Sequence, residues 1–320
     1  MAAAIRARAA RGLTVLFSVV IPTFNRRAWL ALALPSVWAQ TCTDYDVIVI
    51  DDGSTDGTLD YLSTVAQPVH VIRQANLGAG AARNAGIAVA TGDYLAFLDS
   101  DDFWFPWTLA AMAETIRAHG GPVLIAGQVM QFTDEAETAR VSPECVQSIG
   151  FGDFLASSRR PLLIGSGTVV ARRDEVTAIG GFTTRNINGE DTDLFLRLGV
   201  TTGFVAITAP ITVAWRRHGE SATHGLDRSI EGVTYLVGQE RAGTYPGGHQ
   251  RARERREVIT RHTRSVSFAC LRSNAVSAGL RIFGATVRWH LQLGRWAYLI
   301  AFPLAAMWAS ARSIAGLRPS

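Results

Sequence analysis

Cysteine is scarce in this sequence: the 320 residues contain three, at Cys42, Cys145 and Cys270. They lie far apart, and the sequence has no Cys-x-x-Cys pair and no cluster of cysteine with histidine. This spacing argues against disulfides and against a cysteine-ligated zinc site. We expect reduced thiols in a cytoplasmic protein.

Charged residues are also scarce, at 18% of the chain, compared with about a quarter in an average globular protein. Hydrophobic residues make up 48%, which supports a sizeable core and argues against global disorder. The length suits one large domain, or one domain with an appendage. The net charge of +4 is modest, but arginines gather in the C-terminal part, which indicates an acidic partner there.

Long apolar runs are missing at both ends of the chain. Residues 1–16 contain early arginines and only a short apolar run, so we predict a tail and no signal peptide. Near the other end, the apolar stretch from Trp296 to Ala311 is shorter than the roughly 20 residues that span a bilayer, and Pro303 interrupts it.

Tryptophans and arginines flank this C-terminal stretch, at Trp289, Trp296 and Trp308 among others. Such residues suit a lipid interface. We predict a peripheral attachment to an anionic membrane surface, on the inner face of the cell membrane. A short tilted span, a helical cap on the main domain and a contact in a homo-oligomer are the alternatives.

Apolar, partly β-branched runs alternate with helical patterns in the first 120 residues. This alternation is typical of an α/β fold with a mainly parallel central sheet flanked by helices. Asn25 can cap the first helix, and Pro35 is expected to kink or divide it. The predicted strands are 17–21, 47–50, 69–72 and 94–98, and the predicted helices are 25–40, 78–90, 106–118 and one that starts near residue 56.

The pattern becomes looser after Gly121. We predict strands at 123–132, 162–171, 204–207 and 211–215 and a helix at 190–198. Residues 226–249 contain glycine and are weakly patterned, which indicates a linker, and residues 250–320 are predicted to be a mainly helical extension. The predicted domains are therefore the tail 1–16, a main domain 17–225, the linker 226–249 and a C-terminal helical region 250–320.

Polar residues directly follow three of the predicted strands. In parallel sheets the ligand binds beyond the carboxyl ends of the strands, so these side chains should meet at one edge. That convergence is the main physical argument for a functional site here. The residues are Thr23, Asn25, Asp51, Asp52, Asp99 and Asp101.

Five motifs occur in order along the chain: VVIPTFNR at 19–26, VIDDGSTDGT at 49–58, NLGAGAARNAG at 76–86, GDYLAFLDSDD at 92–102 and GEDTDLFLRL at 189–198. Each motif alone is weak evidence, but their order and spacing are specific. Together they resemble the family 2 inverting glycosyltransferases, which have the GT-A fold. The resemblance covers roughly residues 17–220 and implies a nucleotide-sugar donor.

Asp99-Ser100-Asp101 matches the DXD motif of that family. A nucleoside diphosphate is polyanionic, and Mg²⁺ or Mn²⁺ prefers carboxylate oxygens, often one or two of them beside phosphate and water. The resemblance implies that Asp101 binds the metal directly and that Asp99 lies near the ribose or the metal. The alternative is a turn or helix cap, which Ser100 and Asp102 could also form.

Several residues in the other motifs are expected to bind the nucleotide. The resemblance assigns Asp52 to the base, although DDGST could equally be a turn with a helix cap. It places Pro22, Thr23 and Asn25 at the start of the pocket. Arg83 lies on a helix built mainly of alanine and glycine, where an arginine is usually solvated, but in the family it holds the nucleotide pocket.

Glu190-Asp191 matches the acidic motif that carries the base in the family. An inverting transfer needs a carboxylate that takes the proton of the acceptor hydroxyl. The resemblance implies that Asp191 is this base and that Glu190 supports it or contacts the acceptor; favourable acids in a first helical turn are the alternative. Trp215-Arg216-Arg217-His218 follows the last strand, and Arg216 or His218 could stabilise the leaving diphosphate.

The sequence therefore predicts a metal-dependent, inverting transferase of the hexosyltransferase type, acting on a glycan or lipid-linked acceptor in cell-envelope or polysaccharide synthesis. The Gln-x-x-Arg-Trp signature of processive synthases and their many membrane spans are missing from the sequence, which favours transfer of a single sugar over polymer extrusion. A sugar nucleotidyltransferase would carry a glycine-rich basic loop where PTFNR stands, and a non-catalytic GT-A scaffold would have lost acidic residues. The basic stretch 251–264 has no interleaved aromatic residues, so no nucleic acid partner is expected.

Overall fold

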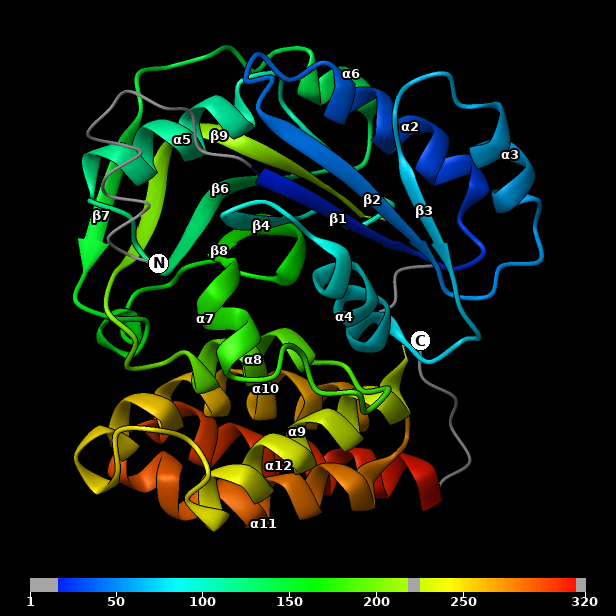
Figure 1. Cartoon of the computed structure of the whole chain (residues 1–320). Coiled ribbons are helices and arrows are strands. Elements are labelled where there is room, and N and C mark those ends of the chain that lie inside the picture. The colour runs from blue at the N-terminus through cyan, green and yellow to red at the C-terminus, as the bar shows by residue number, and fades with distance from the viewer. Residues whose placement is uncertain (1–16, 218–224, 315–320) are drawn as a thin grey trace. The chain divides into compact units, whose positions relative to one another are not determined.

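The computed structural model describes residues 17–217 and 225–314, and these form two compact units (Figure 1). The first unit contains residues 17–186 and 200–217, and the second contains residues 187–199 and 225–314. The predicted tail 1–16 and His218 lie outside the described residues. The second unit thus takes the short segment 187–199 out of the predicted main domain.

Nine strands of the described chain form one sheet in the first unit, in the order β3-β2-β1-β4-β8-β6-β9-β5, with β7 beside β9. The neighbours from β3 to β4 are parallel, as are β6 and β9, whereas β8, β5 and β7 run antiparallel to their neighbours. The strands are β1 (Phe17–Thr23), β2 (Tyr45–Asp51), β3 (His70–Arg73), β4 (Tyr94–Phe97), β5 (Phe103–Trp104), β6 (Leu124–Phe132), β7 (Gln147–Phe151), β8 (Val169–Arg172) and β9 (Phe204–Arg216).

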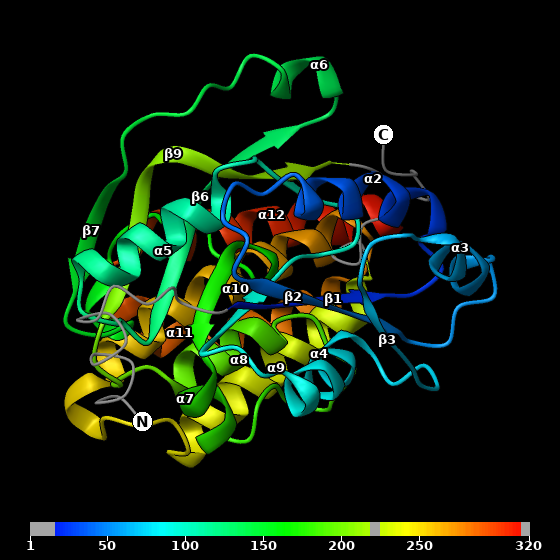
Figure 2. The ribbon, with the colours of Figure 1, turned by 45° about the horizontal axis from the view of Figure 1, so that its top comes forward.

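Helices cover both faces of the parallel part of the sheet (Figure 2). Alternate residues of β1, such as Val19 and Ile21, share one core with α2, α3 and α5. On the other face, α4 approaches so closely that a Cβ on Gly86 would lie 2.7 Å from Val20 Cγ1. The helices are α2 (Arg27–Trp38), α3 (Thr58–Thr64), α4 (Ala79–Val89), α5 (Thr108–Ala118), α6 (Glu135–Thr138) and α7 (Arg173–Ala178). The predicted α/β class is confirmed.

Four local predictions for this unit are wrong in whole or in part. Asn25 does not cap α2, because its backbone has a φ of 50° and the N-cap is Arg26. Pro35 does not divide α2, which is assigned as one helix from residue 27 to 38. The predicted strand 162–171 shrinks to β8, preceded by a 3₁₀ turn at Ser166–Thr168, and the two strands predicted at 204–215 are one, β9.

The second unit is helical, and the predicted linker 226–249 is mostly the helix α9. Val233, Leu236 and Val237 of α9 are buried at helical spacing, and the helix ends at Gly243, whose φ is 70°. The glycines of this segment hid that apolar stripe in the sequence. The helices are α8 (Glu190–Arg197), α9 (Leu226–Ala242), α10 (Ala252–Arg272), α11 (Val276–Gln292) and α12 (Trp296–Ile314), so the helical extension is confirmed.

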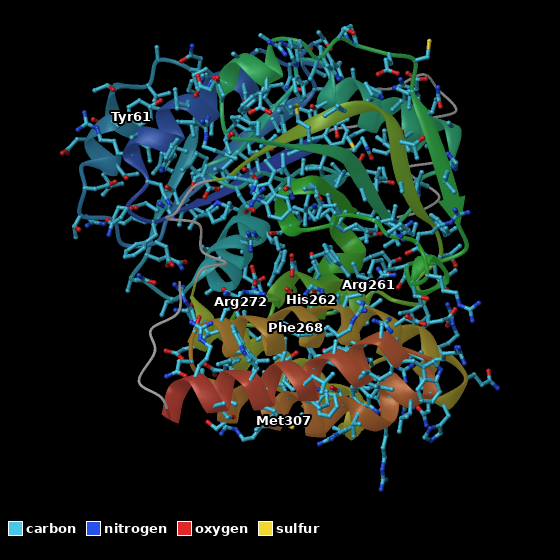
Figure 3. All side chains as sticks on the ribbon, turned by 180° about the vertical axis from the view of Figure 1, so that it is seen from behind. Tyr61, Arg261, His262, Phe268, Arg272 and Met307 are labelled. Carbon is cyan, nitrogen blue, oxygen red and sulfur yellow. The ribbon has the colours of Figure 1, made fainter. Side chains whose placement is uncertain are left out.

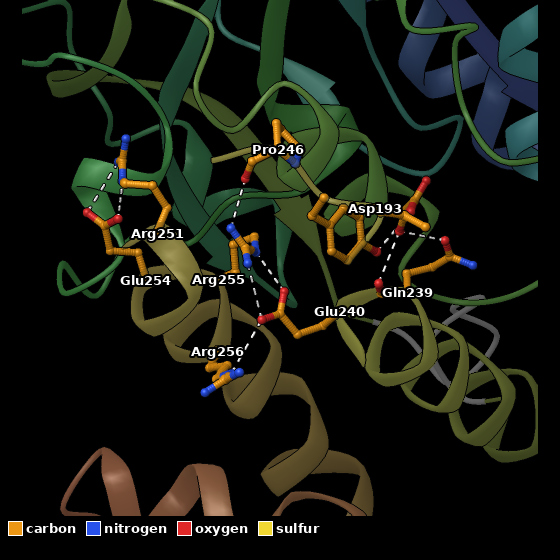
Figure 4. A network of polar contacts seen from close by, with 10 residues as sticks. Asp193, Gln239, Glu240, Pro246, Arg251, Glu254, Arg255 and Arg256 are labelled. Carbon is orange, nitrogen blue, oxygen red and sulfur yellow. Dashed lines mark hydrogen bonds and ion pairs between the residues drawn. The ribbon is translucent and has the colours of Figure 1, made fainter. Parts of the chain in front are cut away.

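Polar contacts join the N-terminal helices of this unit (Figure 4). Glu240 on α9 forms ion pairs with Arg255 and Arg256 on α10, with Oε2 2.6 Å from Arg255 Nε. The hydroxyl of Tyr245 donates to Asp193 Oδ1 on α8 across 3.0 Å. No helix within the described residues meets the length and apolarity needed to cross a membrane.

Candidate functional site

The carboxyl ends of β1 and β2 lie side by side, with Thr23 opposite Asp51 in the register. The amide of Asp52 donates to the carbonyl of Thr23 across 2.8 Å, which holds the two chain ends together. Thr23 is buried, and its hydroxyl has no hydrogen-bond partner in the part of the chain that the structure describes. A buried hydroxyl left in this way favours a ligand as its partner.

The Asp52 carboxylate organises the loop that leads into α4. Oδ1 accepts hydrogen bonds from Gln74 Nε2 at 2.8 Å and from the amide of Leu77 at 2.9 Å, and Oδ2 accepts from the amide of Gly78 at 2.8 Å. A carboxylate has about four acceptor sites, so three of them are used within the protein. Gly53, with a φ of 87°, lets the loop before α4 pack close to the turn after β2. A Cβ at this position would lie 3.1 Å from the amide nitrogen of Asn76.

Asn25 joins the loop after β1 to the loop after β2. Its backbone amide donates to Ser54 Oγ at 2.9 Å, and its side-chain Oδ1 accepts from the backbone amide of Thr55 at 2.7 Å. Pro22, the neighbour of Thr23 in β1, is buried and lies opposite Ile50. The predicted pocket residues from the first two motifs therefore lie together at one edge of the sheet.

Arg83 forms an ion pair with Asp99, which follows β4, the other neighbour of β1. Arg83 is almost fully buried on α4, its Nη2 donates to Asp99 Oδ1 at 2.7 Å, and its Cζ lies 5.3 Å from the centre of the Phe182 ring. Asp99 keeps 36% of its side chain exposed. A Cβ on Gly167 would lie 2.8 Å from Asp99 Oδ2, so a glycine is needed to admit this carboxylate.

A second arginine, Arg216 at the end of β9, holds the turn that contains Asp101 and Asp102. The amide of Arg216 donates to Asp102 Oδ1 at 2.9 Å, and its Nε donates to the carbonyl of Asp101 at 3.2 Å. Its guanidinium carbon lies 4.8 Å from the ring centre of Trp29 and 4.7 Å from that of Phe132. Arg216 is thus buried between rings and shapes this turn.

The adjacent aspartates Asp101 and Asp102 differ in environment. Burial raises the pKa of Asp102 well above its usual range, and the negative charges of Asp99 and Asp101 raise it further. Asp102 is therefore a structural carboxyl group, bonded to the backbone of Arg216. Asp101 is only half-buried, and so is more open to a ligand than Asp102.

The metal prediction can be compared with the donors present. Among the described residues, no cluster of three or more His, Cys, Asp or Glu side chains could hold a metal ion. Mg²⁺ in phosphate sites commonly takes one or two carboxylates and completes its shell with phosphate and water. Asp99 and Asp101 fit such a partial set of oxygen donors, in which the diphosphate supplies the other ligands.

Glu190 and Asp191 lie in the first turn of α8, in the second unit. Gly189 precedes them with a φ of 102°, and its amide donates to Glu190 Oε2 at 3.1 Å. Asp191 Oδ1 accepts from the amide of Thr192 at 2.6 Å. Negative charge in a first helical turn also favours the helix dipole, so the alternative of a purely structural role fits this geometry as well.

Sequence reasoning missed several residues that shape these sites. Trp29, Gly167 and Phe182 were not singled out, because their contacts with Arg216, Asp99 and Arg83 join distant segments. Thr192 and His262 were missed for the same reason, since 70 positions separate them. Arg216, in contrast, could be named from the sequence, because it directly follows a predicted strand.

Comparison with known proteins identifies the family. Residues 18–178, half of the chain, match the model of glycosyl transferase family 2. An uncharacterized glycosyltransferase of Nostoc sp. is 41% identical over 104 residues, which are 31% of this chain and 32% of that protein. A PGL/p-HBAD biosynthesis glycosyltransferase of Mycobacterium tuberculosis is 37% identical over 120 residues, 36% of this chain and 47% of that protein. The matched region spans less than half the length of these relatives.

Solved structures show the same fold at lower identity. TarS 1–349 of S. aureus superposes with a TM-score of 0.63 at 18% identity, covering 86% of this chain and 80% of TarS. The mannosyltransferase PcManGT of Pyrobaculum calidifontis, in complex with GDP-Man and Mn²⁺, gives a TM-score of 0.54 at 17% identity, covering 98% and 91%. The predicted GT-A fold is confirmed, and the chain belongs to glycosyl transferase family 2.

Proposed function

We propose that this glycosyltransferase transfers a single sugar, with inversion, from a UDP-linked donor to a hydroxyl of a lipid-linked or glycan acceptor in cell-envelope or polysaccharide synthesis. The observation that carries the proposal is the strand-end edge of the first unit, where Thr23, Asp52 and the Arg83–Asp99 pair follow three neighbouring parallel strands. Solved relatives were captured with UDP, UDP-GlcNAc and GDP-Man, which supports a nucleotide-sugar donor.

The nucleotide would bind along this edge. The buried hydroxyl of Thr23 needs a partner, and the Asp52 carboxylate keeps about one acceptor site for a base imide or a ribose hydroxyl. Pro22 and Asn25 would line the nucleotide site next to these residues. Arg83 on α4 would hold the Asp99 carboxylate in place. His218, outside the described residues, remains a proposed contact of the diphosphate.

A divalent cation, Mg²⁺ or Mn²⁺, would be held by Asp101, with Asp99 beside the metal or the ribose. When bound, the cation neutralises negative charge on the departing nucleoside diphosphate. The protein's own contribution is the turn itself, because Arg216 Nε donates to the carbonyl of Asp101 and the Arg216 amide donates to the side chain of Asp102. These bonds hold the turn that carries the half-buried Asp101.

The proton of the acceptor hydroxyl would pass to the carboxylate of Asp191. In an inverting transfer the acceptor oxygen attacks the anomeric carbon opposite the departing diphosphate, so that the C–O bond forms as the bond to the nucleotide breaks. A carboxylate in hydrogen-bond reach of the hydroxyl lowers this barrier as general base. Glu190, which accepts from the amide of Gly189, would support the turn or contact the acceptor.

A donor panel tests this proposal. Purified full-length protein is incubated with UDP- and GDP-linked sugars and Mn²⁺, and both thermal stabilisation and release of the nucleoside diphosphate are measured. We expect stabilisation and release with a UDP-linked sugar, loss of release in EDTA, and loss of transfer in Asp191→Asn. Equal release in EDTA would overturn the metal assignment, and full transfer by Asp191→Asn would overturn the base.

We also propose that the second unit attaches peripherally to the inner face of the cell membrane. Helix α12 exposes an apolar stripe at helical spacing whose five large side chains are each between 56% and 63% exposed: Trp296, Ile300, Leu304, Met307 and Trp308. After Glu257 the sequence has no further Asp or Glu, whereas eight arginines follow. An apolar stripe beside positive charge suits the interface of an anionic bilayer.

Flotation with vesicles tests the attachment. Full-length protein should float with vesicles that contain phosphatidylglycerol, and the variant Leu304→Gln/Met307→Gln should stay at the bottom of the gradient. Leu32→Gln, at a leucine of the first unit that is 47% exposed, is the control. If the wild type ignores anionic vesicles and the stripe variant converts a dimer into a monomer in light scattering, the stripe is an oligomer contact and the membrane proposal is wrong.

A further inference from the structure

The hydroxyl of Thr192 lies between Asp191 on α8 and a histidine of α10. Thr192 Oγ1 is 3.3 Å from Asp191 Oδ1 and 3.1 Å from His262 Nε2. Thr192 is buried, Asp191 is half-buried and His262 is exposed. Figure 3 labels His262 on α10. All three residues belong to the second unit, so the arrangement lies within one compact body.

The direction of these hydrogen bonds follows from the chemistry of the groups. An ionised Asp191 carboxylate can only accept, so the Thr192 hydroxyl donates its single proton to Asp191. The oxygen of Thr192 is then an acceptor toward His262, and Nε2 of the imidazole must carry the proton. A histidine protonated on Nδ1 alone would instead accept from Thr192 and remove the hydroxyl from Asp191.

The surroundings of His262 favour a neutral ring. Protein atoms around the partly exposed imidazole reduce its solvation, and the positive charge of Arg261 acts in the same direction, which together lower the pKa of His262 to about 4. A neutral ring protonated on Nε2 therefore matches the donor that Thr192 needs at neutral pH.

The two helices are held at this spacing by other contacts. Tyr245 bonds to Asp193 on α8, and the Arg255 guanidinium of α10 donates to the carbonyl of Pro246, next to Tyr245. Ile259 and Thr263, on either side of His262 in α10, are fully buried. The backbone positions of Thr192 and His262 are thus set independently of the bond between them.

We propose that His262 is a positioning residue for the base: through the hydroxyl of Thr192 it fixes the orientation of the Asp191 carboxylate toward the acceptor. The inference rests on the proposed role of Asp191 and adds the residues that aim it. A carboxylate held in one rotamer keeps its acceptor oxygen in line with the attacking hydroxyl, and small misplacements of such groups are costly in rate.

Steady-state kinetics of the full-length protein test the inference, with the donor that the panel identifies and water or the acceptor as nucleophile. Thr192→Val and His262→Ala should each lower kcat by about 10- to 100-fold and leave the KM of the donor unchanged. The double variant should be no slower than the slower single variant, because both substitutions break the same chain of bonds. His262→Gln, whose amide nitrogen can replace Nε2 as a donor, should restore most of kcat, whereas His262→Asn should not.

Matched controls separate this effect from damage to the unit. Ser265→Ala, on the exposed side of α10, and Thr234→Val, on the exposed side of α9, should keep wild-type kcat and thermal stability. If Asp191→Asn is inactive but Thr192→Val and His262→Ala keep full kcat, the positioning role is wrong and the base assignment stands. If Asp191→Asn stays active, the proposed base itself has failed. A rise in the donor KM with unchanged kcat would also overturn the inference.

Discussion

The two units use their acidic residues differently. In the first unit, Asp52 and Asp102 accept hydrogen bonds from backbone amides. Asp99 accepts from Arg83 but keeps 36% of its side chain exposed, and Asp101 is half-buried.

In the second unit, Glu240 is buried and paired with Arg255 of the neighbouring helix α10. Asp193 is buried and bonded to Arg197 of its own helix and to Tyr245 of the loop after α9. The first unit thus keeps the carboxylates of Asp99 and Asp101 partly exposed, whereas the second unit uses buried carboxylates to join its segments.

Asp101→Asn should have the largest effect and separate activity from stability. Asparagine keeps the size of the side chain but loses the charge that a divalent cation requires. We expect Mn²⁺-dependent transfer to fall by about 1000-fold, equivalent to several kcal/mol of barrier, because metal stabilisation of the leaving group is lost. The midpoint of thermal unfolding should hardly change. Asp60→Asn, an exposed aspartate of α3, is the control, and a large loss of stability in Asp101→Asn would contradict the comparison.

Glu240→Ala should show the opposite pattern in the second unit. It leaves Arg255, which is 4% exposed, without its carboxylate partner. Removing one member of a buried ion pair costs about 3–5 kcal/mol. Urea unfolding followed by circular dichroism should report this loss for the helical unit. Glu231→Ala, on the exposed side of the same helix, should change stability by less than about 0.5 kcal/mol. An equally small effect for Glu240→Ala would mean that the pair is not structural.

The same contrast explains what could be predicted from the sequence. The strands β1, β2 and β4 and the aspartates after them are local patterns, an apolar run followed by acidic or glycine-rich turns, and they were found. The contacts of Arg216 with Asp102, 114 positions apart, and of Thr192 with His262 have no local signature. The segment 226–249 was read as a linker because glycine lowers helix propensity, although tertiary packing makes α9 a helix.

Two glycines of α9 test whether packing or propensity shapes this helix. A Cβ on Gly232 would lie 1.8 Å from the carbonyl oxygen of Asn188, just before α8, whereas a Cβ on Gly238 would meet nothing within 4 Å. Gly232→Ala should destabilise the second unit by about 1–3 kcal/mol through overpacking. Gly238→Ala should stabilise it by about 0.5–1 kcal/mol, since alanine restricts the unfolded chain and favours the helix. Equal effects of the two variants in urea unfolding would show that the close approach to Asn188 is not required.

Tyr245→Phe should have the smallest destabilising effect, because it removes one hydroxyl and keeps the ring. Burial raises the pKa of Tyr245, and the adjacent Asp193 raises it further, so the hydroxyl stays protonated and donates to Asp193 Oδ1. Asp193 keeps its pair with Arg197, whose Nε lies 2.8 Å from Oδ2, and its charge therefore remains compensated. We expect a loss of about 1 kcal/mol in urea unfolding, the net value of one buried hydrogen bond. A loss as large as that of Glu240→Ala would show that the tyrosine, and not the ion pair, is the main polar link of the second unit.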